Sequence, residues 1–124
     1  MASVKKINLR EVEFQRAPSR RIAELISSKT VGSRYISLRV VEIAGKREEE
    51  QREPHVHLHA EEIIYVQSGF GELHADDGVT PLEEGDAVLI PPGIRHMVRN
   101  RRETPMRLIC VFSQPDPDAG RVGT

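Results

Sequence analysis

The 124-residue sequence has very little cysteine and few aromatic residues. Cys110 is its single cysteine, tryptophan is absent, and the aromatic residues make up 4% of the chain. A single thiol excludes an internal disulfide and every zinc site that is built from several thiolates. Any metal site in this chain therefore has to use histidine and carboxylate ligands.

An excess of charge and a long apolar run are also missing. Lys and Arg number 18 against 19 Asp and Glu, a net charge of −1, which argues against a nucleic-acid-binding surface spread over the molecule. The arginines at 99, 101 and 102 have no interleaved aromatic residues and are interpreted as ordinary surface. No stretch approaches the ~18 apolar residues of a membrane span, and the N-terminus lacks the apolar run of a secretory signal. Neither nucleic acid nor membrane is an expected partner, and a cytoplasmic location is predicted.

Short runs rich in Val, Ile, Tyr and Leu, separated by Gly, Pro, Asp and Asn, predict an all-β protein. Asp76-Asp77-Gly78 is typical of a tight hairpin turn, because Asp-Gly tolerates positive φ. Short strands at this spacing indicate a sandwich or barrel. Segment 20–28 has a pattern that fits a short helix or a strand. The expected strands are 34–43, 54–59, 62–67, 72–75, 79–82, 87–90, 96–100 and 106–112.

These strands define a barrel over residues 34–113. Residues 1–33 are expected to form an N-terminal segment with an edge strand or a strand exchanged in a dimer. Residues 114–124 have two prolines, two glycines and no large apolar residue except Val122, which predicts a flexible tail. The charged run Lys46–Glu53 is interpreted as a solvated loop, with a docking surface or a lid over a pocket as the alternative.

Histidines provide the main chemical signal in the chain. His55, His57 and His59 alternate, so a strand would project all three imidazoles from one face. Glu61 and Glu62 follow closely, and His96 comes after the rigid Pro91-Pro92-Gly93 turn. Imidazoles that converge on one point can bind a cation, whereas the same run can also be a solvent-exposed polar strand face.

Two segments that contain these residues resemble the two motifs of the cupin family. Residues 54–69, PHVHLHAEEIIYVQSG, resemble the first motif, which has two histidines one residue apart, a glutamate after a short gap and a glycine seven positions later. Residues 85–100, GDAVLIPPGIRHMVRN, resemble the second. The resemblance covers roughly residues 34–112 and has one departure: Glu49 stands where the first motif usually opens with a glycine.

This resemblance implies a small antiparallel jelly-roll β-barrel that holds one divalent transition metal per chain. The implied ligands are His55, His57, Glu62 and His96, and such a set suits Fe, Mn, Ni, Zn or Cu. A rival register uses His57 and His59 as the pair. In the preferred register His59 and Glu61 remain candidates for carrying a proton, or are polar residues at the surface.

Other residues give weaker signals. Cys110 alternates with Leu108 and Phe112 and is expected in the core. Arg39 points either into the barrel, where it would suit an anionic substrate, or into solvent. His74 is expected at the surface rather than at a metal.

The resemblance implies a metal-dependent enzyme that acts on a small oxygen-bearing molecule. A dioxygenase is favoured, because the site has no obvious lysine base and few aromatic walls for a sugar. An isomerase or decarboxylase of a sugar or keto acid, or a non-catalytic ligand-binding barrel, remains open. A homodimer is also predicted, because edge strands invite pairing and residues 4–14 carry apolar side chains without an obvious internal partner.

Overall fold

The computed structural model describes residues 2–123, and nearly all of its regular structure is antiparallel β-strand. Two 3-10 turns, η1 (Leu9–Glu11) and η2 (Lys46–Glu48), interrupt the strands. The strands are, in chain order, β1 (Gln15–Ala17), β2 (Arg20–Ile26), β3 (Ser37–Ile43), β4 (Val56–His57), β5 (Glu62–Ser68), β6 (Phe70–Ala75), β7 (Gly78–Glu83), β8 (Ala87–Ile90), β9 (His96–Asn100), β10 (Met106–Phe112) and β11 (Arg121–Val122).

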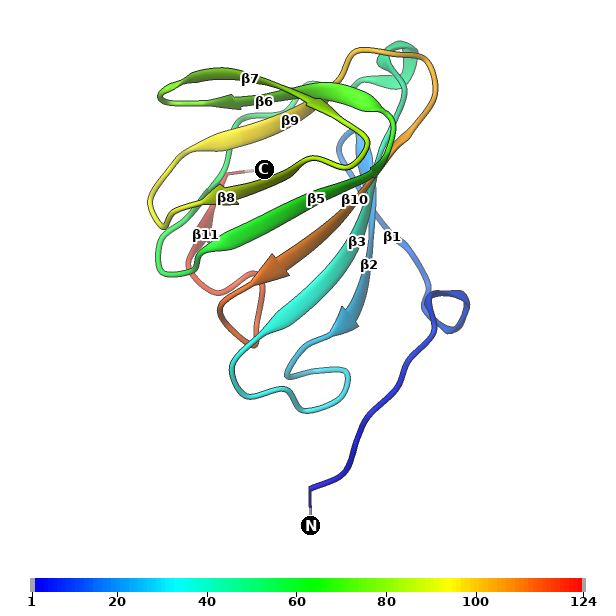
Figure 1. Ribbon diagram of the computed structural model, residues 1–124, viewed down its shortest axis with the longest axis vertical. Helices are drawn as coiled ribbons and strands as arrows, with labels where there is room; N and C mark the ends of the chain where they lie inside the picture. The colour runs from blue at the N-terminus through cyan, green and yellow to red at the C-terminus, as the bar shows by residue number, and fades with distance from the viewer. Residues whose placement is uncertain (1, 124) are drawn as a thin grey trace.

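Two facing layers make up the barrel (Figure 1). The larger is a six-stranded sheet in the order β1-β2-β3-β10-β5-β8. The smaller contains the sheet β7-β6-β9 and the ribbon β11-β4, which an isolated bridge between His55 and His96 connects. All pairings are antiparallel, so the predicted all-β antiparallel jelly-roll barrel is confirmed.

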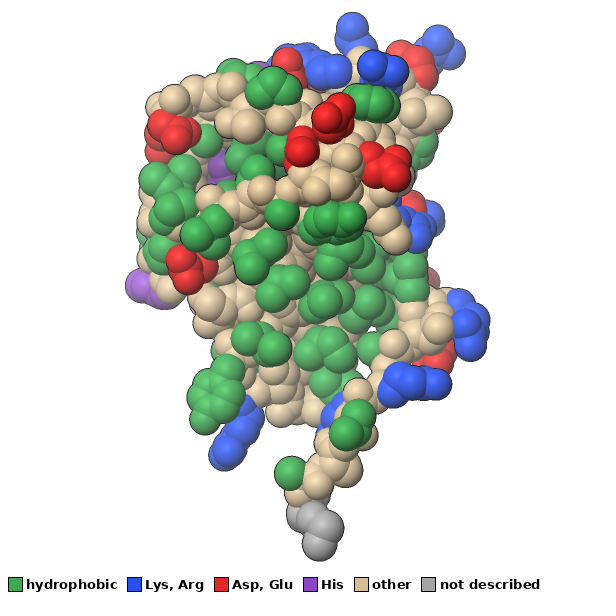
Figure 2. Space-filling view, in the orientation of Figure 1, with side chains coloured by type: hydrophobic (Ala, Val, Ile, Leu, Met, Phe, Trp, Pro, Cys, Tyr) green, Lys and Arg blue, Asp and Glu red, His purple; other side chains and the backbone are tan. Residues whose placement is uncertain are grey.

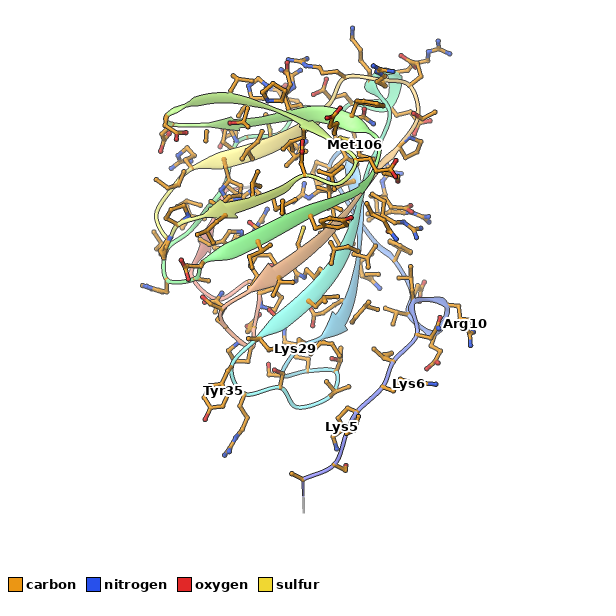
Figure 3. All side chains as sticks on the ribbon, viewed as in Figure 1. Lys5, Lys6, Arg10, Lys29, Tyr35 and Met106 are labelled. Carbon is orange, nitrogen blue, oxygen red and sulfur yellow. The ribbon has the colours of Figure 1, made fainter. Side chains whose placement is uncertain are left out.

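The core follows from the two-residue period of the strands that face each other. On β10 every second side chain, from Met106 to Phe112, is buried, and the same holds for β5 from Glu62 to Val66. Met106 fills the end of the barrel near the β5–β6 turn (Figure 3). A Cβ at Gly71 would clash with the backbone carbonyl oxygen of Arg99 and would lie 2.5 Å from the sulfur of Met106, so only glycine fits there. Each fully buried apolar side chain stabilises the fold by about 1.5–3 kcal/mol.

Most of the predicted strands occur close to their expected places. The expected strands 87–90, 96–100 and 106–112 are β8, β9 and β10 with the same bounds. Residues 20–26 of the ambiguous segment 20–28 form the strand β2, whose backbone pairs with β3. The expected strand 54–59 is reduced to two residues, since the chain bends after His57.

Both ends of the chain contribute strands. Before β1 the N-terminal segment runs away from the barrel and carries Lys5, Lys6 and Arg10 into solvent (Figure 3). At the other end β11 pairs with β4, with Arg121 opposite His57. The segment expected to be a flexible tail is therefore anchored beside the histidine strand through residue 122.

The charged run is exposed but tied down at both sides. The hydroxyl of Ser19 donates to the carbonyl of Glu50 at 2.9 Å, and Arg99 binds Glu49 through two hydrogen bonds of 2.8 and 3.0 Å. Because its other residues are exposed, the segment is a solvated loop that is attached to the barrel by these contacts. Arg52 is the exception, since its side chain lines the cavity inside the barrel. No helix in the described part of the chain is long and apolar enough to cross a membrane.

Candidate metal centre

Four side chains from three strands and one strand end meet inside the barrel. They are His55, His57, Glu62 and His96, and each offers a ligand atom that lies within 4.8 Å of the others. His55 and His96 are held together by reciprocal backbone hydrogen bonds of 2.9 and 2.8 Å. The carbonyl of His57 accepts from Gly93 at 2.8 Å, which fixes the proline-rich turn beside the site. The geometry brings together the four residues that the family resemblance implied.

A carboxylate oxygen of Glu62 and a ring nitrogen of His96 lie at hydrogen-bond distance, and both can act as acceptors. Nε2 of His96 lies 3.0 Å from Oε1 of Glu62, while its Nδ1 lies 2.9 Å from the carbonyl of Ile94. A carbonyl can only accept, so Nδ1 carries the proton and Nε2 of a neutral ring presents a lone pair. Two acceptors this close are stabilised by a proton or by a metal ion between them.

The other two imidazoles have nitrogens without hydrogen-bond partners. Among residues 2–123, Nδ1 of His55 and both ring nitrogens of His57 are buried and make no hydrogen bond. Nε2 of His57 lies 3.5 Å from Oε1 of Glu62, too far for a good hydrogen bond. Unsatisfied buried polar atoms are costly, and a bound cation would satisfy them. Three nitrogen donors and one carboxylate fit a divalent transition metal.

Burial keeps these imidazoles neutral. It lowers the pKa of His55 to about 2, and the neighbouring charges of His96 and Arg121 act in the same direction. Burial also lowers the pKa of His57, although Glu62 opposes the shift. Both rings therefore retain their lone pairs at neutral pH, which is the protonation state that a metal ligand requires.

The four residues line a cavity of about 540 Å³. Phe112 packs against the ring of His57 with their centroids 5.0 Å apart. Cys110 is buried beside Glu62, and burial together with the Glu62 charge raises the pKa of its thiol well above the usual value. Cys110 is thus confirmed as a core residue that stays protonated. The apolar walls are Ile22, Val41, Ile43, Ile64, Val98 and Leu108.

An ion-pair network around the largely buried Arg39 forms another wall of the cavity. Arg39 binds Asp118 through two hydrogen bonds of 3.0 and 2.7 Å and Glu24 through one of 3.0 Å. The hydrogen bond from Arg39 lowers the pKa of Asp118, and burial opposes this shift without overcoming it. The side chain of Arg39 is 11% exposed, so of its two sequence interpretations the inward one is confirmed.

The remaining sequence candidates lie elsewhere. The side chain of His59 is exposed beside Gly120, and that of Glu61 is exposed while its backbone pairs with Ser113. His74 is on β6, with Nε2 3.0 Å from Oε1 of Glu72. None of these three lines the cavity.

Six charged residues of the cavity were not singled out from the sequence, and two of them are Glu13 and Arg52. Arg20 and Glu24 alternate on β2, and this pattern would have indicated an inward face had the segment been assigned as a strand. Asp118 and Arg121 lie in the segment expected to be a tail. No local signal marks them, because only the pairing of β11 with β4 brings them to the site.

Comparison with known families agrees with this geometry. A family model described as the Cupin domain matches residues 40–112, which include the four clustered residues. This match covers more than half of the chain. The chain therefore belongs to the cupin family.

Two relatives from Streptomyces align with much of the sequence. Protein SchB of Streptomyces halstedii is 37% identical over 84 residues, which are 66% of this chain and 61% of SchB. Polyketide synthase CurC of Streptomyces cyaneus is 29% identical over 122 residues, which are 95% of this chain and 76% of CurC. The aligned part of this chain thus spans about three fifths of SchB.

Solved structures share the fold over almost the whole chain. Ectoine synthase from P. lautus superimposes with a TM-score of 0.75 at 20% identity, covering 98% of this chain and 90% of that protein. The polyketide cyclase RemF from Streptomyces resistomycificus gives a TM-score of 0.73 at 22% identity, covering 92% and 83%. At these identities the likeness concerns the fold.

Proposed function

We propose that this protein is a metal-dependent enzyme that cyclises or dehydrates a small polycarbonyl substrate of the polyketide type without consuming oxygen. One observation carries the proposal: three imidazoles and a carboxylate converge in a cavity with mostly apolar walls and ionised groups at its side. That combination suits a flat, oxygen-rich carbon skeleton whose carbonyl oxygens face the polar end of the cavity.

The names of similar proteins support the same substrate class. CurC is named a polyketide synthase, and RemF is a polyketide cyclase. Ectoine synthase, which shares the fold, is named for the synthesis of its product, and its name does not indicate an oxidation. These names favour carbon-skeleton chemistry over the oxygen-dependent route that the sequence suggested.

Some residues of the cavity would bind the metal, and others would contact the substrate. His55, His57, Glu62 and His96 would hold a divalent cation, which when bound supplies a Lewis acid for substrate oxygens. The apolar walls exclude water from the carbon skeleton. Asp118, kept ionised by Arg39, is the carboxylate that we assign to accept a proton from an acidic carbon between two carbonyls. Its conjugate acid can return that proton to a leaving hydroxyl.

A dioxygenase is the second candidate, because the same ligand set also suits Fe(II) and leaves coordination positions for substrate and oxygen. An oxygen electrode distinguishes the two. We expect linear di- and triketones to be converted without oxygen uptake by protein loaded with Zn(II), Mn(II) or Fe(II), and the His57→Ala variant to be inactive. If the ketones are converted only by the Fe(II)-loaded protein and oxygen is consumed, the protein is a dioxygenase. No conversion with any metal would contradict an enzyme of this substrate class.

We also propose that the protein works as a homodimer. The outer face of the larger sheet supports this, because hydrophobic side chains gather over β5, β10 and β3 while charged side chains lie mostly at the margins (Figure 2). Ile63, Tyr65 and Leu89 are each more than two-fifths exposed on this face. A second copy would cover it. The cytoplasmic location expected from the sequence remains a prediction.

A further inference from the structure

Arginines are concentrated in the cavity to an extent that the metal centre does not explain. Four of them, from four different segments, line it: Arg20 on β2, Arg39 on β3, Arg52 in the charged loop and Arg121 on β11. Arg39 is neutralised by Asp118 and Glu24. The other three face the same space without such partners.

The hydrogen bonds of these three arginines go to backbone carbonyls. Arg20 donates to the carbonyl of Pro18 at 2.9 Å, Arg121 donates to that of Gly123 at 3.2 Å, and Arg52 donates to that of Val98. Within residues 2–123, no carboxylate lies at ion-pair distance from any of the three. In the same part of the chain Nε of Arg52 is buried and makes no hydrogen bond.

Their charges also act on one another across the cavity. Burial lowers the pKa of Arg20 to about 10, and repulsion from Arg121, Arg52 and Arg39 adds to the shift. Burial likewise lowers the pKa values of Arg52 and Arg121, although Glu49 opposes the shift of Arg52, and Asp118 and Glu62 oppose that of Arg121. Guanidinium groups that are partly desolvated and repel one another are stabilised when an anion enters between them.

These three arginines line the same cavity as the metal centre. Arg121 is paired with His57 across the β11–β4 ribbon, and the charges of Arg121 and Arg20 both act on His55. A ligand whose oxygens reach the histidine cluster therefore has its charged end within reach of these guanidinium groups. The planar fork of arginine matches the two oxygens of a carboxylate.

We propose that Arg20, Arg52 and Arg121 form an anion subsite that binds a carboxylate of the substrate beside the histidine cluster. This inference rests on the proposed function and narrows it, since the substrate becomes a polycarbonyl compound with a free acid group, such as a keto acid. A neutral polyketone or an ester would leave the three guanidinium groups, among residues 2–123, without a carboxylate at ion-pair distance.

A pair of matched probes tests the subsite without the metal and without turnover. Salicylate and salicylamide have nearly the same shape and differ mainly in charge. Isothermal titration of chelator-treated, full-length protein should show salicylate binding about tenfold more tightly than salicylamide. Raising the NaCl concentration from about 0.05 M to about 0.5 M should reduce this preference, because salt screens the attraction.

Arginine variants locate the effect. Arg20→Gln and Arg121→Gln should each reduce the preference to about twofold or less, whereas Arg101→Gln, whose arginine pairs with Glu72 outside the cavity, should retain it. Circular dichroism and thermal melts establish that each variant is folded. If one variant fails to fold, the difference between salicylate and salicylamide binding by the wild-type protein, and its dependence on salt, still test the anion subsite.

Equal binding of the two probes by the wild-type protein overturns the proposal, and so does a preference that survives both substitutions. Tighter binding of phenyl phosphate with the same arginine dependence overturns the assignment to a carboxylate. The titration uses metal-free protein, whereas the proposed enzyme activity is measured with metal and substrate. A failure of the anion subsite can therefore be distinguished from a failure of the proposed activity.

Discussion

Some buried polar side chains of this barrel have hydrogen-bond partners for their polar atoms, and others do not. Asn100, which ends the second motif, is fully satisfied: its amide donates to the carbonyl of Thr104 at 2.7 Å and its oxygen accepts from the backbone of Arg102 at 2.9 Å. His57 is equally buried but, within residues 2–123, its ring nitrogens make no hydrogen bond. Asn100 therefore fixes the β9–β10 turn, whereas the ring nitrogens of His57 are available to bind a cation.

Asp118 is the residue to which we assign proton transfer in the proposed function. Replacing it by asparagine removes the ionised acceptor but keeps the size of the side chain, so kcat should fall about 100-fold with little change in KM. Steady-state kinetics on a converted diketone measures this. Glu61→Gln is the control, because Glu61 is an exposed carboxylate outside the cavity. An unchanged kcat in Asp118→Asn, or a similar loss in Glu61→Gln, would refute the assignment.

Glu42 provides a pH-dependent contribution to stability. Burial tends to raise its pKa, but hydrogen bonds from Arg107 and Arg21 outweigh it and lower the pKa. A carboxylate whose pKa is lower in the folded state stabilises the fold above its unfolded value of 4.5, and this contribution is lost as pH falls through the folded pKa. Because both arginines are partly exposed, we expect Glu42→Gln to cost about 1 kcal/mol at pH 7.

Urea unfolding of wild type and Glu42→Gln at neutral pH and at about pH 3 measures the difference in their free energies of unfolding. The difference between wild type and Glu42→Gln should shrink at the lower pH. A difference of the same size at both values would show that the charge of Glu42 does not contribute.

At the scale of elements, the short ribbon of β4 and β11 positions His55. Gly123 has φ +101°, and a Cβ there would lie 2.6 Å from the carbonyl of Pro54 and 3.0 Å from Cα of His55. Gly32 has φ +73° with nothing within 4 Å of the same position. An alanine would therefore be strained by the positive φ at both positions, but would clash with neighbouring backbone atoms only at position 123.

Gly123→Ala should weaken binding of Zn(II) about tenfold by displacing His55, whereas Gly32→Ala should cost only about 1 kcal/mol of stability and leave metal affinity unchanged. Competition with a chromophoric chelator gives the affinities. Equal affinities in both variants would mean that β11 does not position the metal ligands.

The elements that could be predicted from the sequence are those with local signals. The strands β8, β9 and β10 are bounded by turn residues, and the cluster of His55, His57, Glu62 and His96 lies within two compact motifs. The charged wall depends instead on contacts between distant parts of the chain. Arg39 and Asp118 are 79 residues apart, and no short window of sequence encodes such a pairing.

At the scale of the whole molecule, the apolar outer face of the larger sheet predicts the dimer. Light scattering should report about twice the chain mass of 14.0 kDa at micromolar concentration. Ile63→Lys places a charge in the middle of this face, since Ile63 lies opposite both Leu89 and Val111, and it should shift the protein toward the monomer.

Thr80→Lys, on the exposed strand β7 of the other layer, is the matched control and should stay dimeric. A wild-type mass of 14.0 kDa would exclude the dimer. A dimer that Ile63→Lys leaves intact would place the interface elsewhere.

The central claim is that the four clustered residues hold one divalent metal ion per chain. Elemental analysis of protein purified without a histidine tag and dialysed against trace Zn(II) tests it directly. The account predicts about one metal ion per chain for the wild type and for His59→Ala, whose imidazole lies outside the cluster, and near-complete loss for His96→Ala and Glu62→Ala. A wild-type protein with little metal, or metal content that neither His96→Ala nor Glu62→Ala changes, would contradict it.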